Sequence, residues 1–378
     1  MTLIDRYLLT TWIKVYLICY ISLAGLYVVI DAFSNLDELL RYGPAHGGVL
    51  VLLAKYYAPR LLTFFDYTSG ILSVIASLFT LVWLQSTQEL TALVAAGIRK
   101  GRIVAPLIVA AMFVSALATA NRELLIPEFR GPLSRNFQDL DGTAAKKVQP
   151  QWDLETNLQI NGQNSFAKRQ EIEKPRIQLP QELASFGTAL IAERGFFRPA
   201  EGDRPAGILL EEVIRPAGTD KRPSAKIGEK TVVFSPSDTP WLKPRELFVV
   251  TNIHFELLSA NQLWRQLAST TELVAGLANP SLDYGPDVRL AVHRRLLKPL
   301  VDITLLLLGL PLILTGENRN VWWAIALCLL VIGAYFGVEL ACHSAGTHLL
   351  LRPGVAAWIP LLIFLTLAAF LSDPLRNE

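Results

Sequence analysis

Hydrophobic residues are gathered in six long runs, and a polar insert separates the third run from the fourth. The runs cover residues 8–30, 67–84, 103–120, 296–315, 321–338 and 355–371. Each is close to the length of about 17–25 residues with which a helix crosses the hydrocarbon core of a bilayer. Because unpaired backbone amides in lipid cost several kcal/mol each, we expect all six runs to be transmembrane helices.

The polar insert between these runs has the pattern of a β domain. Prolines and glycines interrupt short stretches of β-branched and aromatic residues, such as residues 230–234 and 246–255. This pattern is typical of an antiparallel fold and predicts an all-β sandwich or jelly roll. We therefore expect membrane helices in residues 1–120 and 291–378, with a jelly-roll-like domain at residues 121–290 between the third and fourth helices.

The end of the insert has a helical rather than a β pattern. Apolar side chains recur at helical spacing, at Leu263, Leu267, Val274 and Leu277. Ser259, followed three residues later by Gln262, has the form of a capping box, which begins many helices. We expect one amphipathic helix that leads back to the membrane.

Composition agrees with a membrane protein. Hydrophobic residues make up 52% of the chain, a high fraction for a sequence of which nearly half is a polar insert. The three cysteines, Cys19, Cys328 and Cys342, lie in or beside apolar runs, so the insert must fold without disulfides. The first run is too long for a secretion signal and lacks a small-residue cleavage pattern near Ile30, so we expect a retained helix.

The orientation follows from the basic residues of the short segments. An even number of helices places both chain ends on one side. Seven basic residues lie on that side and four on the other: Arg6, Lys14, Arg99, Lys100, Arg102, Arg319 and Arg376 against Arg41, Lys55, Arg60 and Arg352. Because Lys and Arg are enriched in cytoplasmic loops, we expect both termini in the cytoplasm and an exported insert.

The loop between the second and third runs predicts a short helix at about residues 86–97. Residues 86–89 have a capping-box pattern, and Gly97 supplies a left-handed stop. Leu90, Leu93 and Val94 share one apolar face of this helix. Two interpretations remain open: an interfacial helix in the lipid headgroups, or a coupling helix that fills a groove on a cytoplasmic motor protein.

Candidates for enzymatic chemistry are few. His343 and His348 are five residues apart and the chain has no H-E-x-x-H motif, so we expect no metal site and no cofactor. Asp66, Asp302 and Glu339 lie in or near the apolar runs, where charges are expensive and often functional. No set of these residues forms a catalytic arrangement, and nothing indicates a nucleic-acid partner. An intramembrane enzyme is the weaker alternative to a transporter.

Four segments, taken in order along the chain, resemble the LptF/LptG permease family, the membrane subunits of the lipopolysaccharide exporter. They are Asp5-Arg6-Tyr7-Leu8; Gln88-Glu89-Leu90 through Ala95-Ala96-Gly97; Glu123, Pro127 and Arg135-Asn136; and Arg294-Arg295-Leu296 with Pro299-Leu300. The resemblance covers both membrane parts and the position of the insert. A lipoprotein-releasing permease is the alternative, but that class has its large insert after the first helix.

The resemblance implies a specific assembly. Family members sit in the inner membrane, pair with a second LptF/LptG-type subunit and dock a coupling helix on a cytoplasmic ABC ATPase dimer. They extract lipopolysaccharide and pass it to periplasmic LptC/LptA-like bridge proteins. By this resemblance Glu89, Leu90 and Gly97 match the coupling segment, to which the apolar face adds Leu93 and Val94. The chain has no P-loop, its nearest string being Gly228-Glu229-Lys230-Thr231, so a partner must hydrolyse the ATP.

Basic residues crowd the outer ends of the second and fourth runs, where positive charge is disfavoured. They are Arg289, His293, Arg294, Arg295 and Lys298 before the fourth run, and Lys55 and Arg60 before the second. They are either snorkelling anchors or a clamp for the phosphates of a glycolipid headgroup. Arg294 and Lys298 are four residues apart and share a helix face. Pro59 is expected to place Lys55 and Arg60 in a loop.

Overall fold

The chain folds into two units in the computed structural model, which describes residues 2–377 except 141–143, 203, 259–262, 283 and 315–320. One unit is helical and comprises Met1–Phe129 with Gly285–Glu378, and the other is Arg130–Tyr284. The capping pattern at Ser259 and Gln262 lies outside the described residues.

Six helices of the first unit are long and apolar enough to cross a membrane within the described ranges, as the sequence predicts. They are α1 (Leu3–Ser34), α3 (Val49–Ser86), α5 (Lys100–Ala120), α11 (Gly285–Leu314), α12 (Val321–Thr347) and α13 (Pro353–Asn377). Beyond α5 the chain continues as a π-helical turn, η2 (Asn121–Leu125), and a short α6 (Ile126–Glu128). The protein is therefore a multi-pass membrane protein.

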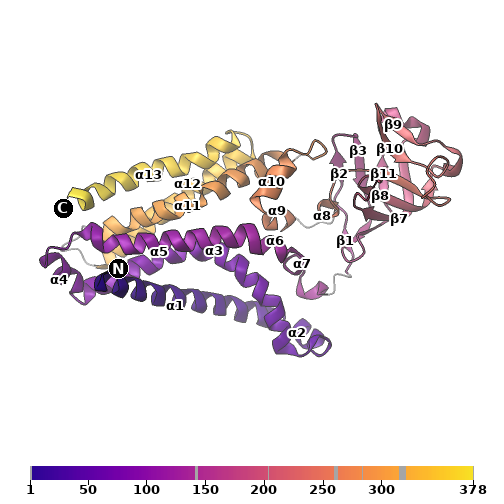
Figure 1. Cartoon of the computed structure of the whole chain (residues 1–378). Helices are drawn as coiled ribbons and strands as arrows, with labels where there is room; N and C mark the ends of the chain where they lie inside the picture. Colours follow the sequence, from indigo (N-terminus) through magenta and orange to yellow (C-terminus); the bar gives the residue numbers. More distant parts are fainter. Residues whose placement is uncertain are drawn as a thin grey trace. The chain divides into compact units, whose positions relative to one another are not determined.

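The ends of the helix bundle carry different short elements. The start of α1, the end of α13 and the short helix α4 (Glu89–Ala95) lie at one end of the bundle (Figure 1). The other end carries α2 (Leu36–Tyr42), the 3-10 turn η1 (Pro44–His46) and the connection from α12 to α13 (Figure 1). The β-rich unit is inserted in the chain between α6 and α11.

The bundle is held by a continuous apolar core. Helix α11 packs against α3, α5, α12 and α13, and α1 packs against α3 and α5. Leu8, Trp12, Leu81, Ile103 and Leu306 are almost completely buried in this core. Since lipid tails are as apolar as leucine, side-chain packing and polar contacts must hold such helices together. The hydrogen bond from the Trp12 indole to the Ser77 hydroxyl, at 2.8 Å, is one such contact between α1 and α3.

The second unit is built around an 11-stranded antiparallel sheet, which confirms an inserted β domain. Its strands are β1 (Lys146–Lys147), β2 (Gln151–Asp153), β3 (Leu158–Asn161), β4 (Asn164–Phe166), β5 (Glu171–Glu173), β6 (Arg176–Gln178), β7 (Ala189–Arg198), β8 (Gly207–Arg215), β9 (Ala225–Ile227), β10 (Lys230–Phe234) and β11 (Leu247–Val250). The main path runs β1-β4-β5-β7-β8-β11-β10-β9, and β6, β3 and β2 branch from β7.

Alternating burial along the strands builds the core of this unit. In β3, Leu158 and Ile160 are fully buried while the residues between and after them are partly exposed, the period of two expected for a strand with one buried face. The long hairpin of β7 and β8 contributes further core residues from its inner face. A Cβ atom at Gly207 would overlap the Val249 carbonyl oxygen, so glycine allows β8 and β11 to approach there.

The strand expectations are confirmed for residues 230–234 and only partly for 246–255. The first range is β10, whereas the second yields the four-residue β11 followed by a turn and the short helix α8 (Phe255–Leu258). Thr251 ends β11, because its hydroxyl accepts from the Ile253 amide at 3.2 Å and donates to the Asp153 carboxylate at 2.7 Å. Such side-chain bonding competes with the strand ladder.

The expected single amphipathic helix near the end of the insert is wrong. The chain forms two helices there, α9 (Leu263–Leu267) and α10 (Thr270–Leu277). Ser269 separates them because it caps α10: its hydroxyl accepts from the Glu272 amide at 3.1 Å, and the Glu272 carboxylate accepts from the Ser269 amide at 2.9 Å. This reciprocal capping box fixes a new helix start.

Candidate functional site

The segment expected to form a coupling helix contains α4, but its start differs from the sequence prediction. The expected capping box at residues 86–89 is wrong, because Ser86 still belongs to α3 and its hydroxyl donates backwards to the Trp83 carbonyl at 2.8 Å. Gln88, with a φ of 63°, turns the chain into α4. Gly97 has a φ of +80°, as expected of a left-handed stop.

The apolar face of α4 is divided between the bundle and the outside. Leu90 and Leu93 are partly buried and pack against the core of the helical unit. Val94 is 37% exposed, and the neighbouring Thr91 and Ala95 are also exposed. Leu90 and Leu93 therefore pack inward, and the outward surface of α4 is made of Val94 and smaller side chains.

Polar contacts tie α4 and its neighbours to the start of α1. The Tyr7 hydroxyl donates to Oε2 of Glu89 at 3.0 Å, which joins α1 to α4. Asp5 accepts from Arg102 at 3.2 Å, which joins α1 to α5. Glu89 therefore does more than stabilise the first turn of its own helix.

Arg294 contacts α12. Its guanidinium forms an ion pair with Glu339 and lies 3.2 Å from Nδ1 of His343. The Arg294 side chain remains 41% exposed, so the pair is open to solvent or headgroups. Glu339, at the end of an apolar run, thus has a basic neighbour.

Lys298, one turn further along α11, contacts a different helix. Its ammonium donates to Oδ1 of Asp66 on α3 at 2.9 Å and also to the Asp66 backbone carbonyl. Arg122 on η2 donates to the other oxygen, Oδ2, from Nε at 2.9 Å and from Nη2. Asp66 is only 5% exposed and thus receives two cations from two other elements. We call Asp66, Arg122 and Lys298 the buried ion triad.

The remaining basic residues have separate surroundings. Arg289 and Lys55 are exposed, whereas Arg295 is partly buried, with Arg122 and Asp66 among its charged neighbours. Lys55 and Arg60 lie within α3, so the expected loop is wrong and Pro59 is accommodated inside a helix.

Arg60 stacks on an aromatic ring. The centre of its guanidinium is 3.3 Å from the Tyr56 ring centroid, and Nη1 donates to the Tyr56 carbonyl at 2.9 Å. A cation over an aromatic face gains electrostatic stabilisation, so this side chain has a fixed position. Arg294, Lys298 and Arg60 each have local partners within the helical unit.

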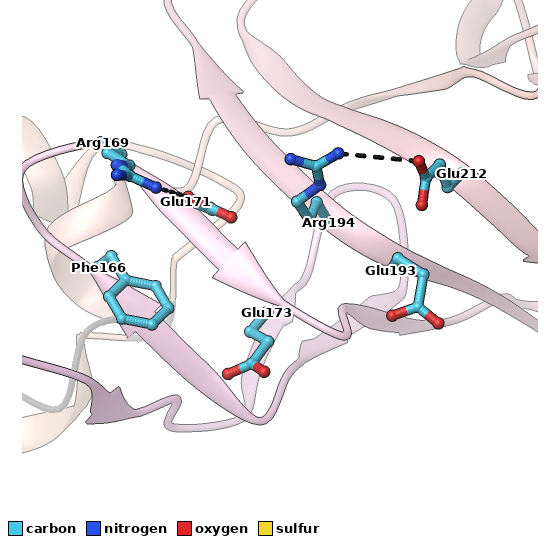
Figure 2. Close-up of a pocket in the computed structure, with 7 residues that line it drawn as sticks. All are labelled: Phe166, Arg169, Glu171, Glu173, Glu193, Arg194 and Glu212. Carbon is cyan, nitrogen blue, oxygen red and sulfur yellow. Dashed lines mark ion pairs between the residues drawn. The ribbon is translucent and has the colours of Figure 1, made fainter.

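A pocket of about 490 Å³ lies in the β unit and has a different character (Figure 2). It is lined by Phe166, Arg169, Glu171, Glu173, Glu193, Arg194 and Glu212. Arg169 lies 3.8 Å from Glu171, and Arg194 lies 3.8 Å from Glu212. With four carboxylates and two guanidinium groups the pocket has an acidic surplus, which does not suit an anionic ligand. Among the residues described, no cluster of His, Cys, Asp or Glu has the form of a metal site.

Comparison with known families covers nearly the whole chain. The family model described as Lipopolysaccharide export system permease LptF/LptG matches residues 6–373. The match includes the six long helices, the β-rich insert, α4 and the buried ion triad. The comparison with curated proteins finds no match.

Proposed function

The chain belongs to the LptF/LptG family of lipopolysaccharide-export permeases, and we propose that it works as one half of an ATP-driven exporter. It extracts lipopolysaccharide from the inner membrane and delivers it to periplasmic LptC/LptA-like bridge proteins. Its membrane partner is a second LptF/LptG-type subunit, and a cytoplasmic ABC ATPase dimer supplies the energy. The observation that carries this proposal is the family match over residues 6–373.

In this proposal the bundle end with both termini faces the cytoplasm. That end carries α4 (Figure 1). The sequence assigns seven of the eleven basic residues of the short segments to the side of the termini, in agreement with the positive-inside rule. The β unit then lies in the periplasm, on the outer side of the inner membrane, where a bridge protein can reach it.

The segment from Glu89 to Gly97 is proposed to be the coupling element. Val94, at the outward surface of α4, meets the ATPase, while Leu90 and Leu93 transmit its movement to the bundle core. Glu89 transmits it to α1 through Tyr7. An amphipathic helix that is packed on one side and open on the other is suited to this task.

The basic residues at the opposite end are proposed to contact the phosphates of the glycolipid. Arg289 and Lys55 are exposed and available from solvent. Arg294, Lys298 and Arg60 each contact a different part of the helical unit, and Arg295 is partly buried. Because guanidinium groups bind phosphate oxygens through charge-assisted hydrogen bonds, an entering headgroup can compete for those that remain partly open.

Copurification from the native membrane tests the coupling proposal. Val94→Asp should release the ATPase, because burying an unpaired carboxylate in the interface costs several kcal/mol. The matched control is Leu36→Asp on α2, which replaces an exposed leucine at the other end of the bundle and should retain the ATPase. Both variants must elute as the intact permease. If Val94→Asp keeps the ATPase, α4 is an interfacial helix in the lipid headgroups.

Crosslinking of the glycolipid tests the substrate proposal. Arg289→Glu combined with Lys55→Glu reverses two exposed charges for which the structure shows no ion pair in its described residues, so the bundle should assemble normally. We expect reduced crosslinking to lipopolysaccharide at physiological salt. Arg352→Glu, an exposed cation outside the proposed group, is the control. Unchanged crosslinking in the double variant would mean that these residues only anchor the helices at the interface.

A further inference from the structure

Asp302 is a buried carboxyl group in the middle of the helical unit that the proposed export function does not use. It lies on α11, one turn beyond Lys298, and is 9% exposed. Its Oδ2 accepts a hydrogen bond from the Ser115 hydroxyl on α5 at 2.8 Å. A Cβ atom at Gly70 on α3 would overlap its Oδ1, so glycine provides the space that the carboxyl group occupies.

The cations nearest to Asp302 are engaged elsewhere. Arg122 and Lys298 both donate to Asp66, and within the described residues no basic group is within ion-pair distance of Asp302. The Asp66 carboxylate balances one of these two positive charges through direct hydrogen bonds, and in the described structure neither cation donates to Asp302. Asp302 is left with a single neutral donor, Ser115.

Every element around Asp302 contributes a group that bears on its charge. Besides Lys298 on its own helix, they are Asp66 on α3, Arg122 on η2, Tyr16 on α1 and Tyr335 on α12. The Tyr16 hydroxyl is buried and has no hydrogen-bond partner in the described structure. None of these groups places a full positive charge against the Asp302 carboxyl. An unpaired ionised carboxylate in an apolar interior is unfavourable, whereas the protonated acid is neutral.

We propose that Asp302 is a proton-binding site: its carboxyl group carries a proton in the packed arrangement of α3, α5 and α11, and releases it to water when these helices separate. One proton is thereby linked to each opening and closing of this contact. Since the packed arrangement binds more protons than the open one, its stability falls as the pH rises through the range in which hydrated Asp302 ionises.

Infrared spectroscopy of the full chain in lipid nanodiscs tests this proposal directly. Near neutral pH the wild-type protein should show the C=O stretching band of a protonated carboxylic acid. Asp302→Asn should remove that band. The control is Glu339→Gln, which should leave the band in place, because Glu339 forms an ion pair with Arg294. The proposal fails if the wild type lacks the band or if the band persists in Asp302→Asn.

Thermal unfolding across the pH range provides an independent readout. Asparagine has the shape of the protonated acid and keeps an acceptor for Ser115, so Asp302→Asn should fold and should show a weaker decline of the melting temperature with rising pH. If Asp302→Asn unfolds, the neutral form does not suit this packing and the proposal is overturned; it is also overturned if the decline is as steep as in the wild type. Neither measurement depends on the export function, so the Asp302 proposal and the export proposal can fail separately.

Discussion

Replacing Asp66 with alanine removes the carboxylate that Arg122 and Lys298 both contact. The three side chains are 5%, 16% and 23% exposed, so two cations would remain in the bundle without their partner. Breaking a buried ion pair by removing one partner typically costs about 3–5 kcal/mol. We expect Asp66→Ala to lower the free energy of unfolding by about this amount.

Lys298→Met is the informative comparison. It leaves Asp66 paired with Arg122, a neutral arrangement with two hydrogen bonds to one carboxylate oxygen. Lys298→Met should therefore lower the free energy of unfolding only by the contribution of the lost charge-assisted hydrogen bonds, about 1.5–3 kcal/mol. The double variant Asp66→Ala with Lys298→Met should recover part of the loss of Asp66→Ala, because it leaves one unpaired cation instead of two.

Unfolding of the purified chain in mixed micelles, followed by tryptophan fluorescence, measures these free energies. The decisive quantity is the order of the three variants rather than any single value. If Asp66→Ala is as stable as Lys298→Met, or if the double variant is less stable than Asp66→Ala, then the triad does not hold the helices together as described. Such a result would also weaken the argument that Asp66 holds the two cations away from Asp302.

Further predictions address other parts of the molecule. Gly70→Ala should lower the free energy of unfolding in the same assay by about 1–3 kcal/mol, because its Cβ overlaps a carboxyl group on α11, and a neutral result would indicate looser packing. The Lys230 ammonium donates to Glu155 and lowers the pKa of this carboxyl group. The Glu155 carboxylate therefore stabilises the β unit at a pH above its unfolded-state pKa, and this stabilisation is lost as the pH falls through its folded-state pKa. In Glu155→Gln the melting temperature of the full chain should fall less steeply with decreasing pH than in the wild type. In a cysteine-free background, Ser237→Cys should react with an impermeant maleimide in intact spheroplasts and Thr87→Cys should not, and the reverse pattern would contradict the proposed orientation.

Features determined by local sequence were predictable. The six apolar runs became helices because backbone groups in lipid have few other ways to satisfy their hydrogen bonds. Residues 230–234 became β10, and Gly97 took the left-handed conformation that favours glycine. Each of these outcomes depends on residues within one or two turns of the chain.

Features determined by distant partners were not predictable. Arg294 and Lys298 are four residues apart on α11, yet the carboxylates that pair with them lie on two other helices, α12 and α3. Lys298 and Asp66 are 232 residues apart, and no local pattern links them. The capping box predicted at residues 86–89 fails for a local reason instead, because the Ser86 hydroxyl donates to the Trp83 carbonyl within α3.

The buried ion triad also bears on how the protein is made. Asp66 and Arg122 are 56 residues apart and both precede the β unit, whereas Lys298 follows it. A nascent chain can therefore neutralise the Asp66 charge within its first three membrane helices, before the rest has left the ribosome. Lys298 then enters with α11 and finds a carboxylate already held in place. Because Asp66 is already paired with Arg122, the first three helices can stay in the bilayer without an unpaired Asp66 charge. Lys298 then links α11 to these helices.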